Sequence, residues 1–196
     1  MKKLKYLCLF LFIYLIAFVP VVSEGSEIDL GWSVPEYFAD NKGAENEKKF
    51  LIWVFSIGNT IDKAISVSVA TILLTDTNKY YEAKYIPEIA EKVSEDGEKY
   101  LSSDKMKGEY GPGVTRKCVA VFEDIDPNAK KINIFMTGLS HFFFWRSRTS
   151  EYSYKITYKR SGSKWRLVDH GFSKDRSHIN YVDKFKGTPP DTSYWP

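Results

Sequence analysis

The stretch that decides the fold is GPGVTRKCVAVFEDIDPNAKKINIFMTGLSH, from Gly111 to His141. Gly111-Pro112-Gly113 interrupts the preceding chain, and residues 114–122 then gather the β-branched and aromatic side chains that suit a pleated surface. In the second half of this run both faces are apolar, with Cys118 on one face and Val119 on the other. This pattern predicts a strand that is covered on both sides and lies centrally in a sheet.

The second half of the stretch predicts a turn and a return strand. Asp126-Pro127 fits the first two positions of a type I turn, because proline presets the backbone there and aspartate bonds the amide that follows. This turn chemistry also accounts for the acidic cluster of Glu123, Asp124 and Asp126, which could otherwise serve acid–base chemistry or hold calcium. Alternation over residues 132–137 then places three aliphatic side chains on one face.

A family resemblance rests on these residues. The Gly- and Pro-rich loop, the pattern V-x-x-x-x-V-A-V-F, the acidic D-P turn and the pattern I-x-I-x-M-x-G-L resemble the last strand pair of immunoglobulin-like domains in bacterial exported proteins. The motif covers residues 113–139, and strand order extends the likeness from Phe50 to Phe172. The resemblance implies a sandwich that serves as an accessory or binding module, with no catalytic residue and no cofactor.

Further apolar runs complete a prediction of about seven strands. They lie at residues 50–57, 65–71, 80–86, 152–158 and 164–168, and turn residues separate them. The first two form either a hairpin or a connection between sheets, and the last two form a hairpin with an aromatic inner face. The predicted fold class is therefore mostly β, an immunoglobulin-like antiparallel β-sandwich over residues 50–172.

One short helix is predicted before the central strand pair. Pro87 fits the first helical position, Ile86, Ile89, Ala90 and Val93 form one apolar stripe, and Gly97 provides a stop. The surrounding insertion, residues 86–110, is polar in composition. Insertions of this kind between strands are exposed, and we expect this one to offer a contact surface.

The N-terminal segment predicts export. Lys2, Lys3 and Lys5 precede an apolar run over residues 6–19, the layout of a secretory signal that ends at Ser23. An uncleaved membrane anchor is the competing interpretation, because the apolar run approaches the length that spans a bilayer. Residues 24–49 are expected to form a lead-in in which Trp32, Tyr37 and Phe38 pack at an edge of the domain. Residues 173–196 are expected to form an irregular tail.

Charge and cysteine content narrow the function classes. Without the three N-terminal lysines the chain has 25 basic and 25 acidic residues, and this balance disfavours nucleic acid as a partner. Without residues 1–23 the only cysteine is Cys118, so the domain has no internal disulfide. Its apolar surroundings predict a small buried side chain.

An unusual string of aromatic and basic residues follows the central strand pair. Two interpretations stay open: a strand buried on both faces, which we favour, or an exposed surface that docks a partner protein or a membrane interface. The candidate partner surface consists of Phe142, Phe143, Phe144, Trp145, Arg146 and Arg148.

Catalytic and metal-binding patterns are weak. The three histidines, His141, His170 and His178, have no spacing typical of a metal site, and we expect no metal and no cofactor. The weighed alternative is a zinc site from His170, His178 and Asp169 or Asp175, against which we favour solvated side chains after the last strand. Ser140-His141 lacks the G-x-S-x-G elbow of serine hydrolases.

Two functional hypotheses follow. The first is an exported, non-enzymatic module that binds an envelope protein in the periplasm or outside the cell, touching the membrane only through residues 1–23 if they are retained. The alternative is a small extracytoplasmic hydrolase that uses His170 or His178 with nearby carboxylates in a cleft.

Overall fold

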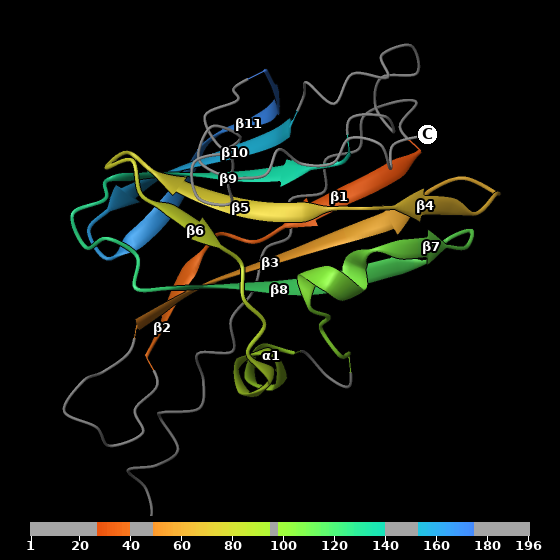
Figure 1. Cartoon of the computed structure of the whole chain (residues 1–196), viewed down its shortest axis with the longest axis horizontal. Coiled ribbons are helices and arrows are strands. Elements are labelled where there is room, and N and C mark those ends of the chain that lie inside the picture. Colours follow the sequence, from red (N-terminus) through yellow and green to blue (C-terminus); the bar gives the residue numbers. More distant parts are fainter. Residues whose placement is uncertain (1–26, 40–48, 95–97, 140–152, 175–196) are drawn as a thin grey trace, which may run out of the picture.

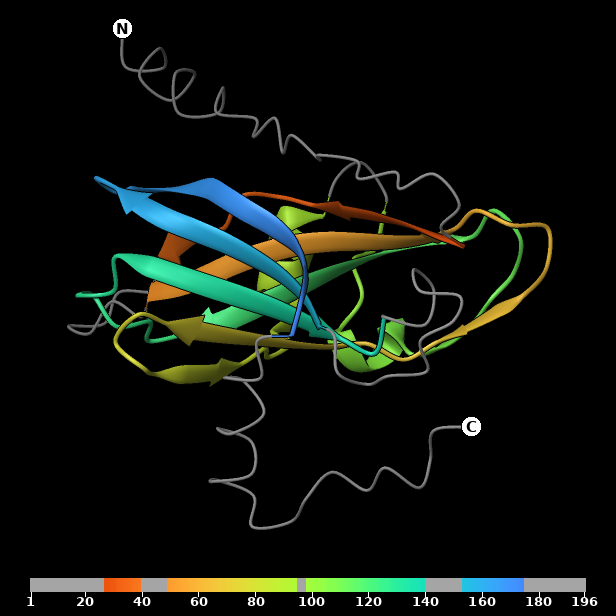
Figure 2. The same ribbon diagram turned by 90° about the horizontal axis from the view of Figure 1, so that it is seen from above.

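The computed structural model describes residues 27–39, 49–94, 98–139 and 153–174. Two antiparallel sheets dominate them and pack face to face (Figure 1). Figure 2 shows the same molecule from above, with the blue and teal strands of one sheet beside the orange and green strands of the other. The prediction of a mostly β sandwich with one short α-helix is confirmed for this part of the chain.

The first sheet is built around a long central strand. Its members are β1 (Ile28–Trp32), β2 (Glu36–Ala39), β3 (Lys49–Asn59) and β8 (Thr115–Glu123). Strand β3 is buried on both faces, as its continuous apolar sequence predicts. Strands β1 and β2 pair with two successive halves of one edge of β3, and β8 pairs with the other edge.

A side chain bridges the gap between β1 and β2. Pro35 has no amide hydrogen, so the ladder cannot continue through it. Ser33 maintains the pairing just before this break: its amide donates to the Val54 carbonyl at 2.8 Å, and its hydroxyl accepts from the Val54 amide at 3.1 Å. Residues 27–39 therefore belong to the sheet, although the sequence placed them in a lead-in.

The second sheet has the order β11-β10-β9-β5-β6. Its members are β5 (Ala70–Thr75), β6 (Tyr80–Glu82), β9 (Lys131–Thr137), β10 (Ser153–Ser161) and β11 (Lys164–Ser173). The predicted hairpin of β10 and β11 is confirmed, and Tyr154, Ile156 and Tyr158 are buried on its inner face. A separate ribbon joins β4 (Ile65–Val67) to β7 (Gly108–Tyr110).

The core lies between the sheets and is rich in aromatic residues. Trp53, Phe55 and Phe122 from the first sheet meet Tyr158 from the second, and all four are fully buried. Burying one large apolar side chain contributes roughly 1.5–3 kcal/mol. Cys118 is buried in this core as a free thiol, which confirms its predicted packing role.

The predicted return strand does not pair with the strand before it. Strand β8 belongs to the first sheet and β9 to the second, so the Asp126-Pro127 segment connects the sheets across one end of the core. Seven residues separate the two strands, and Ile125 and Ala129 are buried among them. A connection of this length can cross the roughly 10 Å between packed sheets, which a tight hairpin turn cannot.

Strand β8 is also an edge strand, although the sequence placed it centrally. Its outer edge carries isolated bridges, one from Val121 to Lys84 and one from Cys118 to Leu101. Both faces are covered as predicted, one by the core and one by α1 (Pro87–Val93). The apolar pattern on both faces therefore predicted correctly that β8 is covered on both sides, but it did not show how many strands pair with it.

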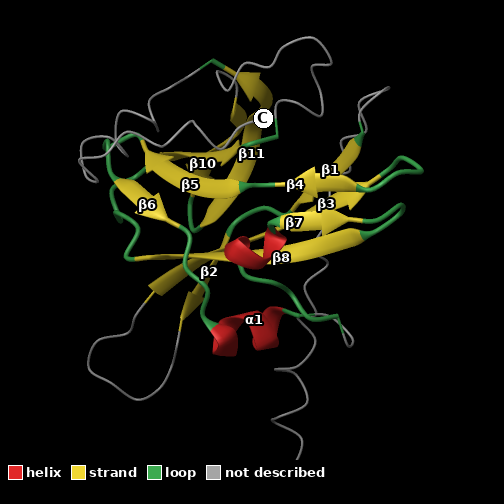
Figure 3. Cartoon of the chain, turned by 45° about the vertical axis from the view of Figure 1, so that its right-hand side comes forward, coloured by secondary structure: helices red, strands yellow, loops and turns green. Residues whose placement is uncertain are grey.

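The helix covers the outer face of the first sheet, below β8 in Figure 3. Ile89 and Ala90 are buried there, so the predicted apolar stripe is confirmed. The helix ends at Val93, before the expected stop at Gly97, because the backbone turns extended at Ser94, with φ −67° and ψ 132°. The Ser94 hydroxyl donates to the Ala90 carbonyl at 2.6 Å and caps this end. A 3-10 turn, η1 (Ser103–Met106), follows in the same insertion.

Two other predicted strands differ in extent. The run 65–71 is split between β4, in the separate ribbon, and β5, in the second sheet, so of the two alternatives the connection between sheets is the one observed. The run 80–86 retains only the three residues of β6. In the described ranges, no helix has the length and apolar content needed to cross a bilayer.

Candidate functional site

Aromatic side chains gather where one edge of the first sheet meets one edge of the second. Strands β1 and β2 supply two of them, and the hairpin β10–β11 supplies the rest. We call this set the aromatic rim; its members are Trp32, Tyr37, Tyr154, Trp165, His170 and Phe172. Because these strands are far apart in sequence, only the packing of the two sheets assembles the rim.

One end of the rim is centred on Tyr154. Its hydroxyl lies 3.1 Å from Nδ1 of His170, and the Phe172 ring meets its own ring edge-on at a centroid distance of 5.0 Å. Burial raises the pKa of Tyr154 to about 12, so the hydroxyl stays protonated at neutral pH and can donate to the imidazole. His170 itself is exposed and gives this end a polar outer surface.

Trp32 closes the same end from the first sheet. Its ring lies 5.5 Å from Tyr154 and 5.2 Å from His170, measured between ring centroids. The side chain is buried, and its indole N–H has no hydrogen-bond partner among the described residues. A buried donor without an acceptor is costly and uncommon in folded proteins, so this atom calls for a functional or structural reason.

The other end of the rim combines aromatic and charged side chains. Tyr37 lies 6.4 Å from Trp165 between ring centroids, and the Arg160 guanidinium lies 5.8 Å from the Tyr37 ring. Burial raises the pKa of Tyr37, while Arg160 opposes the rise. Burial likewise raises the pKa of Glu36, and Lys164 opposes it. Arginine beside aromatic rings is a combination enriched at the centres of protein interfaces.

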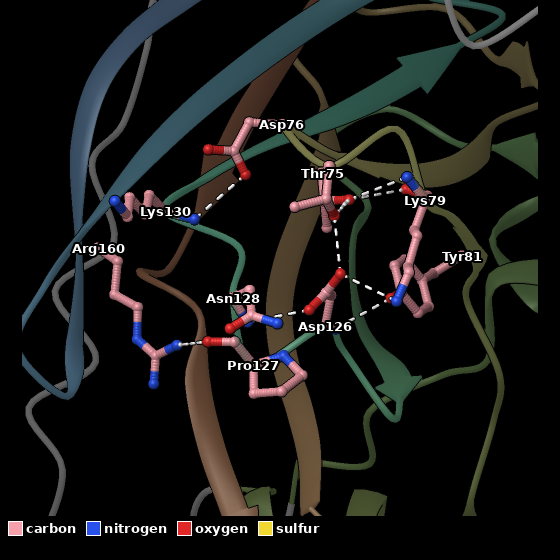
Figure 4. A network of polar contacts seen from close by, with 10 residues as sticks. Thr75, Asp76, Lys79, Tyr81, Asp126, Pro127, Asn128, Lys130 and Arg160 are labelled. Carbon is pink, nitrogen blue, oxygen red and sulfur yellow. Dashed lines mark hydrogen bonds and ion pairs between the residues drawn. The ribbon is translucent and has the colours of Figure 1, made fainter.

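The acidic cluster of the inter-sheet connection is occupied by structural contacts. Asp126 is buried, and its carboxylate accepts from the Thr77 hydroxyl at 3.0 Å, the Lys79 ammonium at 2.9 Å and the Asn128 amide at 2.9 Å (Figure 4). The Lys79 contact, followed by the other hydrogen bonds, lowers the pKa of Asp126 to about 2. Its neighbour Glu123 pairs with Lys84. For Asp126, the predicted turn role is confirmed.

Hydrogen bonds also join the β8–β9 connection to the β5–β6 turn and to the end of β10. Tyr81 accepts a hydrogen bond from the Asp126 amide at 2.9 Å, and Arg160 donates to the Pro127 carbonyl at 2.6 Å (Figure 4). Asp76 accepts from the Lys130 amide at 3.1 Å. These contacts tie β5–β6, the β8–β9 connection and β10 together at one end of the sandwich.

The residues named for a hydrolase or for a zinc site lie only partly within the described ranges. His170 contacts Tyr154 and Trp32, and within the described ranges it makes no hydrogen bond to a carboxylate. Its neighbour Asp169 pairs in register with Thr157, whereas His170 pairs with Ile156, so the two side chains point to opposite faces. His178 and Asp175 lie outside the described residues. Within the described ranges no group of three or more potential ligands could hold a metal ion.

The candidate partner surface of residues 142–148 also lies outside the described residues. The insertion 86–110 is described except for residues 95–97, and its helix packs against the first sheet while Glu88 and Glu91 remain exposed. The aromatic rim was missed as a unit, although Trp32 and Tyr37 had been expected at an edge. The alternation of Ile28, Leu30 and Trp32 with polar or small residues was the available signal for β1.

Comparisons with known proteins give distant likenesses only. No protein-family model matches the chain, and no curated protein matches its sequence. Similar solved structures include a functionally unknown protein from Listeria monocytogenes EGD-e, with 14% identity, a TM-score of 0.45, and coverage of 72% of this chain and 80% of the other. The yjhA protein from Bacillus subtilis is 14% identical with a TM-score of 0.38 over 61% and 78% of the two chains.

A third similar structure is the secreted protein MPT63 from Mycobacterium tuberculosis. It is 9% identical, with a TM-score of 0.33 over 79% of this chain and 92% of the other. At these identities and scores the likenesses assign neither a family nor an activity.

Proposed function

We propose that this protein is an exported, non-enzymatic module of the cell envelope that binds a partner protein through the aromatic rim. The observation that carries the proposal is the convergence of aromatic side chains where one edge of the first sheet meets one edge of the second, with the exposed His170 and the half-buried Tyr37 and Phe172 as its accessible members. Aromatic residues with polar tips supply large contact area at low cost in conformational entropy, and they dominate the energetics of protein interfaces.

The unsatisfied indole of Trp32 favours a binding role for this rim. A partner that places a carbonyl or carboxylate oxygen against the Trp32 N–H, beside the exposed His170 ring, would supply the missing acceptor. Satisfying a buried donor on binding stabilises the complex relative to the free protein. The rim is therefore proposed as the site at which the partner anchors.

The sheet edges favour contact through side chains. Strand β11 carries a bulge between the partners of Thr157 and Tyr158, and Val168 protrudes there with 59% exposure. Strand β6 is only three residues long, and Pro35 interrupts the β1–β2 edge. Bulges, short strands and prolines all obstruct the addition of a foreign strand. A partner that docks by backbone pairing is thus disfavoured at these edges.

The strand order supports an immunoglobulin-like plan within this proposal. The order β1-β3-β8 in one sheet and β10-β9-β5-β6 in the other corresponds to A-B-E and G-F-C-C′ of immunoglobulin domains, with β11 as an addition. Such sandwiches present binding residues on a rigid framework. The proposed location is periplasmic or extracellular, with the N-terminal segment as signal or as membrane tether.

Site-directed photo-crosslinking tests the proposal. A photoreactive aromatic amino acid replaces His170 or Tyr37, one at each end of the rim, in cells that express the protein. A third protein carries it at the exposed Asp62, on a turn outside the rim, as the control. We expect one envelope protein to be captured from both rim positions and not from position 62. Capture from position 62 alone, with all three proteins folded by thermal unfolding, would contradict the proposal.

A further inference from the structure

A row of positive charges crosses the outer face of the second sheet. In the strand register Lys159 of β10 lies directly opposite Lys131 of β9 on one side and Arg166 of β11 on the other. All three side chains are exposed, whereas their chain neighbours Ile132, Tyr158 and Trp165 are buried in the core. We call these three residues the cationic row.

The row is unfavourable for the isolated fold. Side chains directly opposite on antiparallel strands stand about 5 Å apart at Cβ, and like charges in such pairs are destabilising. Within the described part of the chain, none of the three residues takes part in an ion pair, which leaves the repulsion uncompensated. Asp76 and Asp169 lie near the ends of the row, where the Asp76 amide donates to the Lys131 carbonyl and Asp169 pairs with Thr157. Among the described residues neither carboxylate forms an ion pair with the row.

Protection against aggregation does not explain the row. Lysine on an edge strand hinders pairing with another chain, and this reason could apply to Arg166. Lys131 and Lys159 lie on β9 and β10, which have strands on both sides in the sheet. One further cation lies on the same face of β10, Lys155, whose ammonium lies 5.6 Å from the centroid of the Phe135 ring, so positive charge extends beyond one row.

We propose that the cationic row binds the phosphate headgroups of an anionic membrane surface. A sheet presents its outward side chains in one layer, which suits a plane of headgroups better than a single buried anion. Eight residues separate the end of the apolar N-terminal run at Val19 from β1 at Ile28, a distance of at most about 30 Å when extended. A chain held at the bilayer by that segment keeps the row within reach of lipid, and one released by cleavage meets the same surface on export.

The expected affinity is modest and depends on salt. Each Lys or Arg near an anionic surface strengthens binding roughly fivefold, so the row contributes roughly a hundredfold. Such binding weakens as salt rises, because the screening length falls from about 10 Å at 0.1 M to about 3 Å at 1 M. The row acts independently of the aromatic rim, because the rim residues of β10 and β11 point towards the first sheet, whereas the three residues of the row point away from it.

Vesicle sedimentation, which measures the fraction of protein bound to lipid, tests this inference. The protein is isolated as cells export it, and every variant is prepared in the same way. The variants are K131Q/K159Q/R166Q, the milder K159Q, and the control K99Q/K105Q/K107Q, which removes three exposed charges from the insertion near η1. Vesicles are made of phosphatidylcholine with or without phosphatidylglycerol. Thermal unfolding accompanies each measurement, and K131Q/K159Q/R166Q should be at least as stable as the natural protein because repulsion is relieved.

We expect phosphatidylglycerol vesicles to bind the natural protein and the control alike, K159Q roughly fivefold more weakly, and the triple variant roughly a hundredfold more weakly. Equal binding by the control and the row variants would overturn the proposal. Equally strong binding to vesicles with and without phosphatidylglycerol would also overturn it. Displacement of the protein from vesicles by millimolar inorganic phosphate would overturn it too, because it would indicate a site for a free anion. Tight binding of soluble polyphosphate without binding to vesicles would assign the row to a soluble polyanion instead.

Discussion

The indole Nε1 of Trp53 lies 3.1 Å from the hydroxyl of Tyr158, a residue 105 positions further along the chain. Both groups also donate to the Ser33 carbonyl, at 3.0 Å from Trp53 and 2.9 Å from Tyr158. Three elements, the β1–β2 break, β3 and β10, therefore meet in one hydrogen-bonded triangle inside an apolar core. The two rings that form it are fully buried, so the triangle links the two sheets where water cannot compete.

Removing the Tyr158 hydroxyl, and with it two of the three hydrogen bonds, should lower stability only slightly. In Y158F the ring still fills the core, and Trp53 keeps the Ser33 carbonyl as its acceptor, so no buried donor is orphaned. We expect the free energy of unfolding to fall by about 1 kcal/mol in urea titrations. S33A should cost more, about 1–3 kcal/mol, because the Val54 amide loses its acceptor. Y85F, at a tyrosine with 37% exposure, is the control and should change stability by less than about 0.5 kcal/mol.

Asp126 should make stability depend on acid. Its folded-state pKa of about 2 lies below the ordinary value, so folding favours the carboxylate. The stabilisation is present above pH of about 4 and is lost as pH falls towards 2. We expect D126N to lower the melting temperature at neutral pH, and the gap from the natural protein to narrow over that acid range. D62N removes an exposed carboxylate outside this network, and its melting temperature should follow that of the natural protein at every pH. If D62N instead showed the same narrowing gap as D126N, this explanation would be refuted.

Gly58 should resist a methyl group because of one contact. A Cβ at this position would lie 2.7 Å from Oγ1 of Thr115, its register partner on β8. Overpacking of this kind costs about 1–3 kcal/mol, which we expect for G58A by urea unfolding. In G58A/T115A the hydroxyl is gone, so the added cost of the G58A change should shrink. Strict additivity of the two substitutions would show that the clash does not limit this site.

Phe135 should behave as a core residue although its strand position faces away from the inter-sheet core. It is fully buried in a cluster with Ile72 and Leu74 on the outer side of the second sheet. We expect F135A to lower the free energy of unfolding by about 3–5 kcal/mol. V168A, at a side chain with 59% exposure, should change it by less than about 0.5 kcal/mol. A loss below 1 kcal/mol for F135A would indicate that the outer cluster contributes little.

Parts of the candidate surfaces were visible in the sequence. The aromatic alternation of β10 predicted the inward Tyr154, and Trp32 and Tyr37 were expected at an edge, because period-two patterns report faces directly. The hydrolase alternative required carboxylates beside His170, and within the described residues the structure places Tyr154 and Trp32 there. The cationic row was invisible, since Lys131, Lys159 and Arg166 carry no motif and become neighbours only through strand register.

By itself the sequence determined that this chain forms short antiparallel strands around an aromatic core, with a helix at Pro87 and a free buried thiol at Cys118. These features follow from side-chain alternation and from proline geometry, which act over a few residues. Only the tertiary structure decided that residues 114–122 and 132–137 enter different sheets, that Ser33 continues a broken ladder, and that Trp32 meets His170. Pairing between distant strands depends on how whole faces fit together, and no local pattern encodes that choice.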